Sequence, residues 1–198
     1  MHTEDRQGIG EAFGGDNLSC NRRDFLKLAA GALVTGIMPT PALATVLKHT
    51  DARRSLSFYN THTQEKLNVC YFDQTGYRPE ALADINYILR DFRTHEILSI
   101  DPRLLDQLFL VKARIHPRTP FHIISGYRSA ATNAMLRRVS TGVARHSLHT
   151  KGQAVDIRLP GYNTHRLRNL CIQLKAGGVG YYPKSDFVHL DTGRVRTW

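Results

Sequence analysis

The sequence predicts an α+β domain in which helices pack on a small, mainly antiparallel sheet. Two observations support this fold class. The first half of the domain combines a strand-like alternation of apolar residues with two amphipathic helical patterns, and the second half contains short apolar runs separated by one further helix. With 198 residues, the chain is long enough for one such domain with an ordinary hydrophobic core, even if a leader is removed.

The first half begins with a predicted β-hairpin. Residues 54–72 alternate between apolar and polar side chains on either side of a polar turn at 60–64. Apolar residues at helical spacing then predict a helix over 79–92, and the pair Asp101-Pro102 is typical of the start of a second amphipathic helix.

The second half is built from shorter elements. A short apolar run at 121–125 ends at a glycine, and a helical pattern follows at 129–138. Further along the chain, the patterns predict strands at 154–159, 179–182 and 187–191. A helix is predicted at 165–175, between the first two of these strands.

A leader precedes this domain. Arg22 and Arg23 form a twin arginine, an apolar stretch follows at 28–38, and small residues end it at Ala44. The apolar stretch is too short for a membrane span, which needs about 20 residues. Residues 1–44 are therefore predicted to be a twin-arginine signal peptide that is cleaved after Ala44.

Cleavage would leave residues 45–198 as the mature domain. We expect the twin-arginine export machinery to deliver this domain to the periplasm, without a stable membrane anchor. Its 23 basic and 12 acidic residues give a formal charge of +11, compared with +10 for the whole chain. Such a charge favours an anionic partner, and export makes the cell wall a better candidate than nucleic acid, which we do not expect this protein to bind.

The cysteines do not suggest a metal site. Cys20, Cys70 and Cys171 lack the paired spacing of a zinc knuckle and the density of a disulfide scaffold. Cys70 and Cys171 remain after cleavage, and the sequence leaves open whether they pair or stay as free thiols.

Two histidines and an aspartate predict a metal site instead. His149 and Asp156 lie on either side of a glycine in the segment 147–156, and His189 lies on the last predicted strand. Two imidazoles and a carboxylate suit a catalytic Zn²⁺, because three protein ligands leave the fourth tetrahedral position for a water molecule. We therefore expect one zinc ion at this site.

Three motifs resemble a known superfamily. They are SxHxxGxAxD from Ser147 to Asp156, the upstream Ser125-Gly126-Tyr127-Arg128, and the late segment 187–191, FVHLD. Their order and spacing are similar to those of the zinc D-Ala-D-Ala peptidase and hedgehog superfamily (M15-like peptidases). Residues 177–193 most closely resemble its murein endopeptidase branch of the MepK kind, and the similarity covers about 55–198.

The resemblance implies roles for single residues. His149, Asp156 and His189 match the zinc ligands of the family. Arg128 matches an arginine thought to hold the scissile carbonyl oxygen, where a fixed guanidinium would stabilise the negative charge that develops there. A structural salt bridge is the alternative role for Arg128.

The general base is less well defined by the sequence. Related carboxypeptidases place a carboxylate three residues before the last histidine ligand, and Asp186 has that position here. Asp191 and His146 are the alternatives. Asp191 lies two residues beyond His189, so in a strand it would share its face and could equally orient the His189 ring.

These observations predict a zinc metallopeptidase that hydrolyses the peptide cross-links of peptidoglycan. The resemblance implies stem-peptide bonds at meso-diaminopimelate, either D-Ala to diaminopimelate or diaminopimelate to diaminopimelate. A D,D-carboxypeptidase on the same scaffold, and a non-catalytic zinc-stabilised module that binds the cell wall, are the alternatives.

Overall fold

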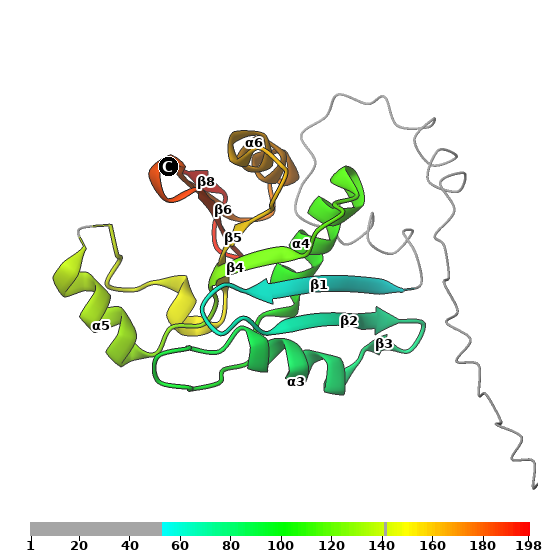
Figure 1. Cartoon of the computed structure of the whole chain (residues 1–198), viewed down its shortest axis with the longest axis horizontal. Coiled ribbons are helices and arrows are strands. Elements are labelled where there is room, and N and C mark those ends of the chain that lie inside the picture. Colours follow the sequence, from blue (N-terminus) through cyan, green and yellow to red (C-terminus); the bar gives the residue numbers. More distant parts are fainter. Residues whose placement is uncertain (1–52, 141) are drawn as a thin grey trace, which may run out of the picture. The chain divides into compact units, whose positions relative to one another are not determined.

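The computed structural model describes residues 53–140 and 142–198. The predicted leader and its cleavage site lie outside these residues. In the described part, eight strands form one sheet in the order β3-β2-β1-β4-β5-β7-β6-β8. The first half of the domain thus forms one side of the sheet and the second half the other, as Figure 1 shows.

The predicted hairpin is confirmed. Strands β1 (Arg54–Asn60) and β2 (Lys66–Asp73) pair in antiparallel register, with Phe58 opposite Leu67. A two-residue strand, β3 (Gly76–Tyr77), extends this edge of the sheet. The sequence did not predict β3, because two residues are too few to show a periodic pattern.

Two helices follow the hairpin. Helix α3 (Pro79–Ile88) is shorter than predicted, since Leu89 leaves the helical conformation but stays buried. Helix α4 (Pro102–Ile115) starts as predicted, and the Asp101 side chain caps it by accepting a hydrogen bond from the backbone N–H of Arg103. These helices lie between β3 and β4 (Phe121–Ser125) in the chain, and β4 pairs in parallel with β1.

The second half also largely follows the predicted layout. Its elements are α5 (Ala130–Val139), the 3₁₀ turn η1 (Leu148–Lys151), β5 (Ala154–Arg158), α6 (Thr164–Leu174), β6 (Gly178–Tyr182), the 3₁₀ turn η2 (Pro183–Ser185), β7 (Phe187–Asp191) and β8 (Arg196–Thr197). Most strand pairs are antiparallel, and only β1–β4 and β6–β8 are parallel. The predicted α+β class is confirmed, with a sheet larger than expected.

The hydrophobic core determines which face of the sheet carries polar residues. Val155 and Ile157 of β5 and Val188 and Leu190 of β7 belong to one buried cluster that also includes side chains of α3, α4 and α6. Because side chains alternate along a strand, the residues between them point to the opposite face. His189 lies on that opposite face of β7.

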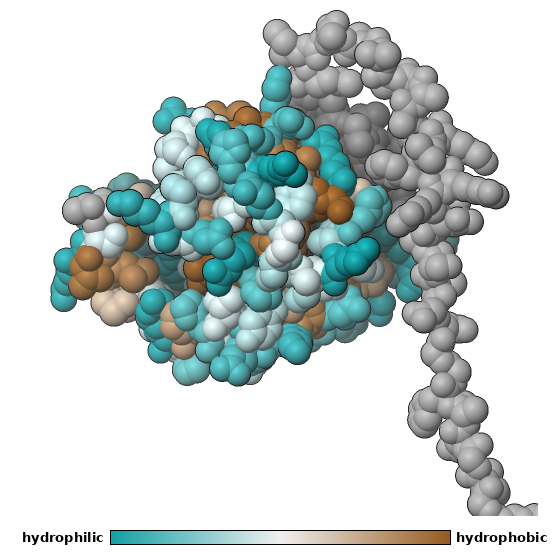
Figure 2. Space-filling view, turned by 45° about the horizontal axis from the view of Figure 1, so that its top comes forward, coloured by the Kyte–Doolittle hydropathy of each residue, from teal (hydrophilic) through white to brown (hydrophobic). Residues whose placement is uncertain are grey.

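Helix α5 projects from the edge of the domain, as Figure 1 shows. It buries the polar residues Thr132 and Asn133, whereas the apolar residues Met135 and Val139 are exposed alongside two arginines. Figure 2 shows the resulting apolar surface on this projection. Hydrogen bonds attach it to the body, including one from the Ser129 N–H to the Asp91 carboxylate at 2.8 Å.

The described residues include both cysteines of the predicted mature domain and the helices α3 to α6. Cys70 and Cys171 are both free thiols there, with Cys171 buried in α6 and Cys70 half-buried in β2. None of the helices in 53–140 and 142–198 has both the length and the apolar character that crossing a bilayer requires.

Candidate metal centre

Three side chains converge on one point at the polar face of the sheet. His149, Asp156 and His189 each offer a ligand atom, and these atoms lie within 4.8 Å of one another. All three residues are buried. The structure thus brings together the three residues that the sequence singled out as ligands.

Strand pairing accounts for much of this convergence. Asp156 on β5 lies directly opposite His189 on β7, and Ser125 on β4 lies opposite Asp156. Directly paired residues point to the same face of a sheet, so these side chains form a row across three strands. His149 joins the row from η1, where the Ser147 hydroxyl accepts a hydrogen bond from the His149 backbone N–H.

Each histidine is oriented by the ring nitrogen that faces away from the cluster. His149 Nδ1 lies 2.7 Å from the carbonyl oxygen of Gly126, and His189 Nε2 lies 3.1 Å from Asp191 Oδ2. Both partners are acceptors, so these nitrogens carry the hydrogen and donate it. His149 Nε2 and His189 Nδ1 are left with free lone pairs for a metal ion.

The charges of the cluster also suit a cation. Burial lowers the pKa of His149, although Asp156 opposes this shift, so the ring stays in the neutral form that binds metals. Burial also opposes a charge on His189, but hydrogen bonds with Asp156 and Asp191 outweigh it and raise the pKa of His189, so a metal ion at Nδ1 would take the place of a proton there. Although burial raises the pKa of Asp156, the two histidines hold it below its usual range. Asp156 is therefore an anion at neutral pH.

The distances within the cluster fit a small tetrahedral ion. His149 Nε2 is 3.1 Å from His189 Nδ1, and Asp156 Oδ1 is 3.2 Å from His149 Nε2 and 2.8 Å from His189 Nδ1. Ligands of tetrahedral zinc are about 3.3 Å apart, given bonds of about 2.0–2.1 Å. The donor set and its spacing therefore match a site with three protein ligands.

Arg128 lies beside this cluster. Its Nη2 donates to Asp156 Oδ2 at 2.7 Å and its Nε donates to the Ser125 hydroxyl at 2.9 Å. Asp156 thus uses one oxygen for Arg128 and presents the other to the two histidines. The Nη1 group of Arg128 has no hydrogen-bond partner within 53–140 and 142–198, so one donor of an otherwise fixed guanidinium stays available.

Asp191 lies behind His189 and is completely buried. Besides His189 Nε2, its carboxylate accepts hydrogen bonds from the backbone N–H groups of Gly178 and Gly193 and from two nitrogens of Arg196. Although burial raises the pKa of Asp191, these hydrogen bonds outweigh it and hold the pKa below its usual range. Asp191 therefore acts as an anionic support for the His189 ring, as a poor proton acceptor.

Asp186 and His146 are not in the cluster. Asp186 has a left-handed backbone conformation (φ 51°) just before β7, and its side chain is 58% exposed. It accepts a hydrogen bond from the Thr164 hydroxyl and lies 3.6 Å from Arg158. His146 is exposed in the loop before η1. The structure thus does not bring Asp186, the first choice for the general base, to the metal ligands.

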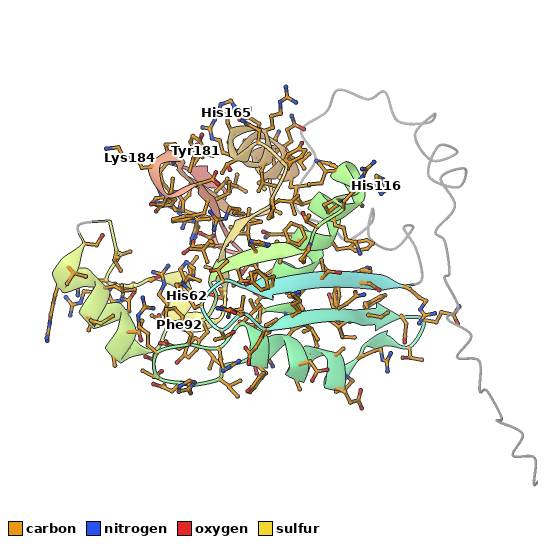
Figure 3. All side chains as sticks on the ribbon, viewed as in Figure 1. His62, Phe92, His116, His165, Tyr181 and Lys184 are labelled. Atoms are coloured by element: carbon orange, nitrogen blue, oxygen red, sulfur yellow. The ribbon has the colours of Figure 1, made fainter. Side chains whose placement is uncertain are left out.

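Other histidines have ordinary structural surroundings. The His62 ring stacks on Phe92 with centroids 3.8 Å apart, and His165 makes an edge contact with Tyr181 (Figure 3). Figure 3 also shows His116 at the far end of α4, where it ends the helix in a left-handed conformation.

Two residues near the end of the sequence also reach the site, and the sequence analysis missed them. Arg196 passes over Gly178 to reach Asp191, and Trp198 passes over Gly180 to reach His189, with ring centroids 5.2 Å apart. The two-residue spacing of the glycines matches that of the arginine and the tryptophan. This matching spacing was a usable signal, but only once β6 and β8 were known to be parallel neighbours.

Charge is divided unequally along the chain of the domain. Residues 53–106 contain 7 basic and 8 acidic side chains, whereas residues 107–198 contain 15 basic and 3 acidic ones. The three acids of the second group are Asp156, Asp186 and Asp191. The candidate metal centre therefore lies in the strongly basic part of the domain sequence, whereas the part before it is nearly neutral.

Known proteins match this chain over almost its whole length. The family described as peptidoglycan L,D-endopeptidase MepK matches residues 48–198. The peptidoglycan L,D-endopeptidase MepK of Escherichia coli (strain K12) is 46% identical over 183 residues, which are 92% of this chain and 100% of the relative. A probable peptidoglycan L,D-endopeptidase MepK of Haemophilus influenzae is 41% identical over 179 residues, covering 90% and 95% of the two chains.

These matches confirm the resemblance on which the sequence analysis relied. They extend on both sides of the metal cluster and Arg128, so they do not depend on one motif. The chain therefore belongs to the MepK family of peptidoglycan L,D-endopeptidases.

Proposed function

We propose that this protein is an exported, zinc-dependent murein endopeptidase that cleaves peptide cross-links of peptidoglycan. The observation that carries the proposal is the buried cluster of His149, Asp156 and His189 with the anchored Arg128 beside it. Zinc, when bound, would supply a Lewis acid and an activated water molecule for amide hydrolysis.

Arg128 is the proposed contact to the reacting group. Nε and Nη2 hold the guanidinium against Ser125 and Asp156, and Nη1 is left to donate to the scissile carbonyl oxygen. Negative charge grows on that oxygen as the carbonyl is attacked, and a fixed cation stabilises it without having to reorganise. This role and the ion pair with Asp156 use different nitrogens, so the two are compatible.

The names of the relatives narrow the choice of bond. A link from D-Ala to diaminopimelate joins two D centres, whereas a link between two meso-diaminopimelate residues joins an L centre to a D centre. The Escherichia coli relative is named an L,D-endopeptidase and the Haemophilus influenzae relative a probable one. We therefore favour the diaminopimelate–diaminopimelate cross-link as the substrate. The basic part of the domain suits the carboxylates of such stem peptides.

Mass spectrometry of muropeptides tests this proposal. Residues 45–198 are incubated with cross-linked dimers of both kinds, with and without a chelator, alongside His189→Ala. Chelator-sensitive conversion of diaminopimelate-linked dimers to monomers, absent in the variant, is the expected result. Release of terminal D-Ala alone would identify a carboxypeptidase instead, and zinc-loaded protein without any product would favour a binding module.

Arg128→Ala separates catalysis from metal binding. Loss of the donor to the carbonyl oxygen should lower kcat by about 10²–10³-fold while zinc content is retained. Arg103→Ala is the matched control, because Arg103 is an exposed arginine that also pairs with an aspartate, Asp101, at the start of α4. Wild-type turnover by Arg128→Ala would rule out the proposed contact.

Asp186→Asn tests the general base suggested by the sequence. Since Asp186 is exposed and bonded to Thr164, we expect this variant to keep a near-normal kcat. If Asp186 nevertheless accepts the proton in the enzyme–substrate complex, kcat should fall by about 10²–10⁴-fold.

Peptidoglycan as the substrate requires a location outside the cytoplasmic membrane. We propose that residues 1–44 direct export by the twin-arginine route, that cleavage follows Ala44, and that folding and zinc loading precede export. The family match begins at residue 48, which fits this boundary. Replacing Arg22 and Arg23 by lysine should leave a folded, zinc-containing precursor in the cytoplasm. A metal-free, unfolded precursor there would contradict the proposed order of events.

A further inference from the structure

An aromatic side chain borders the metal centre on its β6 side. The indole of Trp198 lies against His189, with ring centroids 5.2 Å apart and planes tilted by 50°. His189 is only 8% exposed, whereas Trp198 is 48% exposed. Nearly half of a large apolar surface therefore faces solvent directly beside a metal ligand.

Strand β6 leaves room for this side chain. Gly180 is paired with His189, so a side chain at this position would point to the same face as the ligand. The Cβ of an alanine at 180 would lie 2.7 Å from the indole, and its three nearest atoms all belong to Trp198. Glycine at this position lets the indole reach across β6 to His189.

The indole is also fixed in place. The Trp198 backbone bonds to Val179 and Tyr181 of β6, the guanidinium of Arg196 lies 4.8 Å over the ring, and Nε1 donates to the Tyr182 hydroxyl at 3.0 Å. The Tyr182 oxygen thus accepts a hydrogen bond, and its own hydrogen has no acceptor within residues 53–140 and 142–198. The pair offers an apolar surface next to a hydroxyl donor.

We propose that Trp198 and Tyr182 form a substrate subsite beside the metal centre. The indole packs against the aliphatic chain of a diaminopimelate residue next to the scissile bond, and the Tyr182 hydroxyl donates to a carboxylate of the same residue. This assignment rests on the proposed function, and it names two residues that determine which stem peptides bind.

Intrinsic fluorescence tests the contact directly, because Trp198 is the only tryptophan of the chain. Zinc-loaded protein is excited selectively at its tryptophan and quenched with acrylamide, with and without saturating muropeptide monomer. The subsite predicts that bound muropeptide shields the indole and lowers the quenching constant. Binding of the monomer is measured independently by calorimetry.

Variants separate substrate contact from support of His189. Trp198→Ala should raise KM by about tenfold while kcat, zinc content and melting temperature stay close to wild type, and Trp198→Phe should recover part of the loss. Thr197→Ala is the matched control, since Thr197 is exposed and points to the opposite side of β8. A Trp198→Ala variant that loses zinc, or loses kcat with KM unchanged, would overturn the subsite.

Gly180→Ala provides a second test. An added methyl group displaces the indole, so this variant should raise KM in the same way as Trp198→Ala. Because the nearest atoms disappear with the indole, Gly180→Ala should have little further effect in the Trp198→Ala background. Additive effects of the two substitutions on KM would contradict the proposal.

The outcomes distinguish this inference from the proposed function. An enzyme that cleaves dimers while Trp198 stays equally quenchable with bound muropeptide has no subsite at Trp198, and the proposed function stands. Protein that neither binds nor cleaves any muropeptide refutes the proposed function and this inference with it.

Discussion

Replacing Asp191 by asparagine should weaken metal binding although Asp191 is not a ligand. The carboxylate accepts five hydrogen bonds, from His189, Arg196 (two) and the backbone of Gly178 and Gly193. An amide of the same shape has only one oxygen, so its NH₂ group must face at least one of these donors. With the NH₂ group at the Oδ2 position, the variant loses the hydrogen bond that orients His189 and the bond from Arg196 Nη2.

The structure sets the expected size of both effects. Breaking one partner of a buried ion pair costs about 3–5 kcal/mol, but Arg196 is 32% exposed, so about 2 kcal/mol of unfolding free energy is expected here. Loss of a hydrogen bond to a ligating histidine typically lowers metal affinity about 10–100-fold. The fall of the unfolding free energy at acid pH should also be smaller in this variant. A carboxylate with a lowered pKa stabilises the fold above its ordinary pKa, and this contribution, which the variant lacks, is lost as pH falls.

Competition with a chromophoric zinc chelator measures the affinity, and urea unfolding measures the stability. Asp84→Asn is the matched control, because Asp84 is an exposed carboxylate on α3. Zinc affinity of Asp191→Asn equal to that of wild type would refute the reasoning, since it would mean that the hydrogen bond to His189 Nε2 does not orient the ring.

Three further predictions follow from the described contacts. Gly126→Ala should destabilise the fold and weaken zinc binding in chelator competition, because a Cβ there would overlap the Leu89 backbone and shift the carbonyl that holds His149; unchanged affinity would contradict this. Although burial raises the pKa of Asp91, hydrogen bonds from α5, its N-cap and the 91–94 turn outweigh it and lower the pKa to about 2. Asp91→Asn should therefore remove roughly 2 kcal/mol of stability at neutral pH and less below pH 3, as urea titrations at several pH values would show. Zinc at a thousandfold excess over its Kd should raise the melting temperature by roughly 10 °C in calorimetry, and equal melting with chelator would exclude a folded-state metal site.

The sequence predicts those parts of the site that depend on local chemistry. His149 and Asp156 belong to one short motif and His189 to a strand with a clear apolar pattern, and the resemblance of these motifs to a known superfamily singled them out as candidate ligands. The position of Asp186 was different, because spacing cannot show that a left-handed residue turns its side chain towards Thr164. The contact of Trp198 depends on a parallel pairing that a two-residue strand does not reveal.

The end of α3 also differs from what the sequence pattern predicts. Apolar residues continue at helical spacing to Phe92, but the chain leaves the helix after Ile88 and Leu89 remains in the core. Burial of Leu89 satisfies the apolar pattern without a helical backbone. Periodicity therefore identified which side chains are buried more reliably than where the helix stops.

The unequal division of charge makes this domain a strong electric dipole. Residues 53–106 have a formal charge of −1, and residues 107–198, which contain the candidate metal centre, have +12. In the field of an anionic polymer such a molecule experiences a torque before any contact forms, so the part that contains the candidate site turns towards the polymer during diffusion. Added salt shortens the range of this orientation to about 8–10 Å, which would slow productive encounters without altering a single residue of the site.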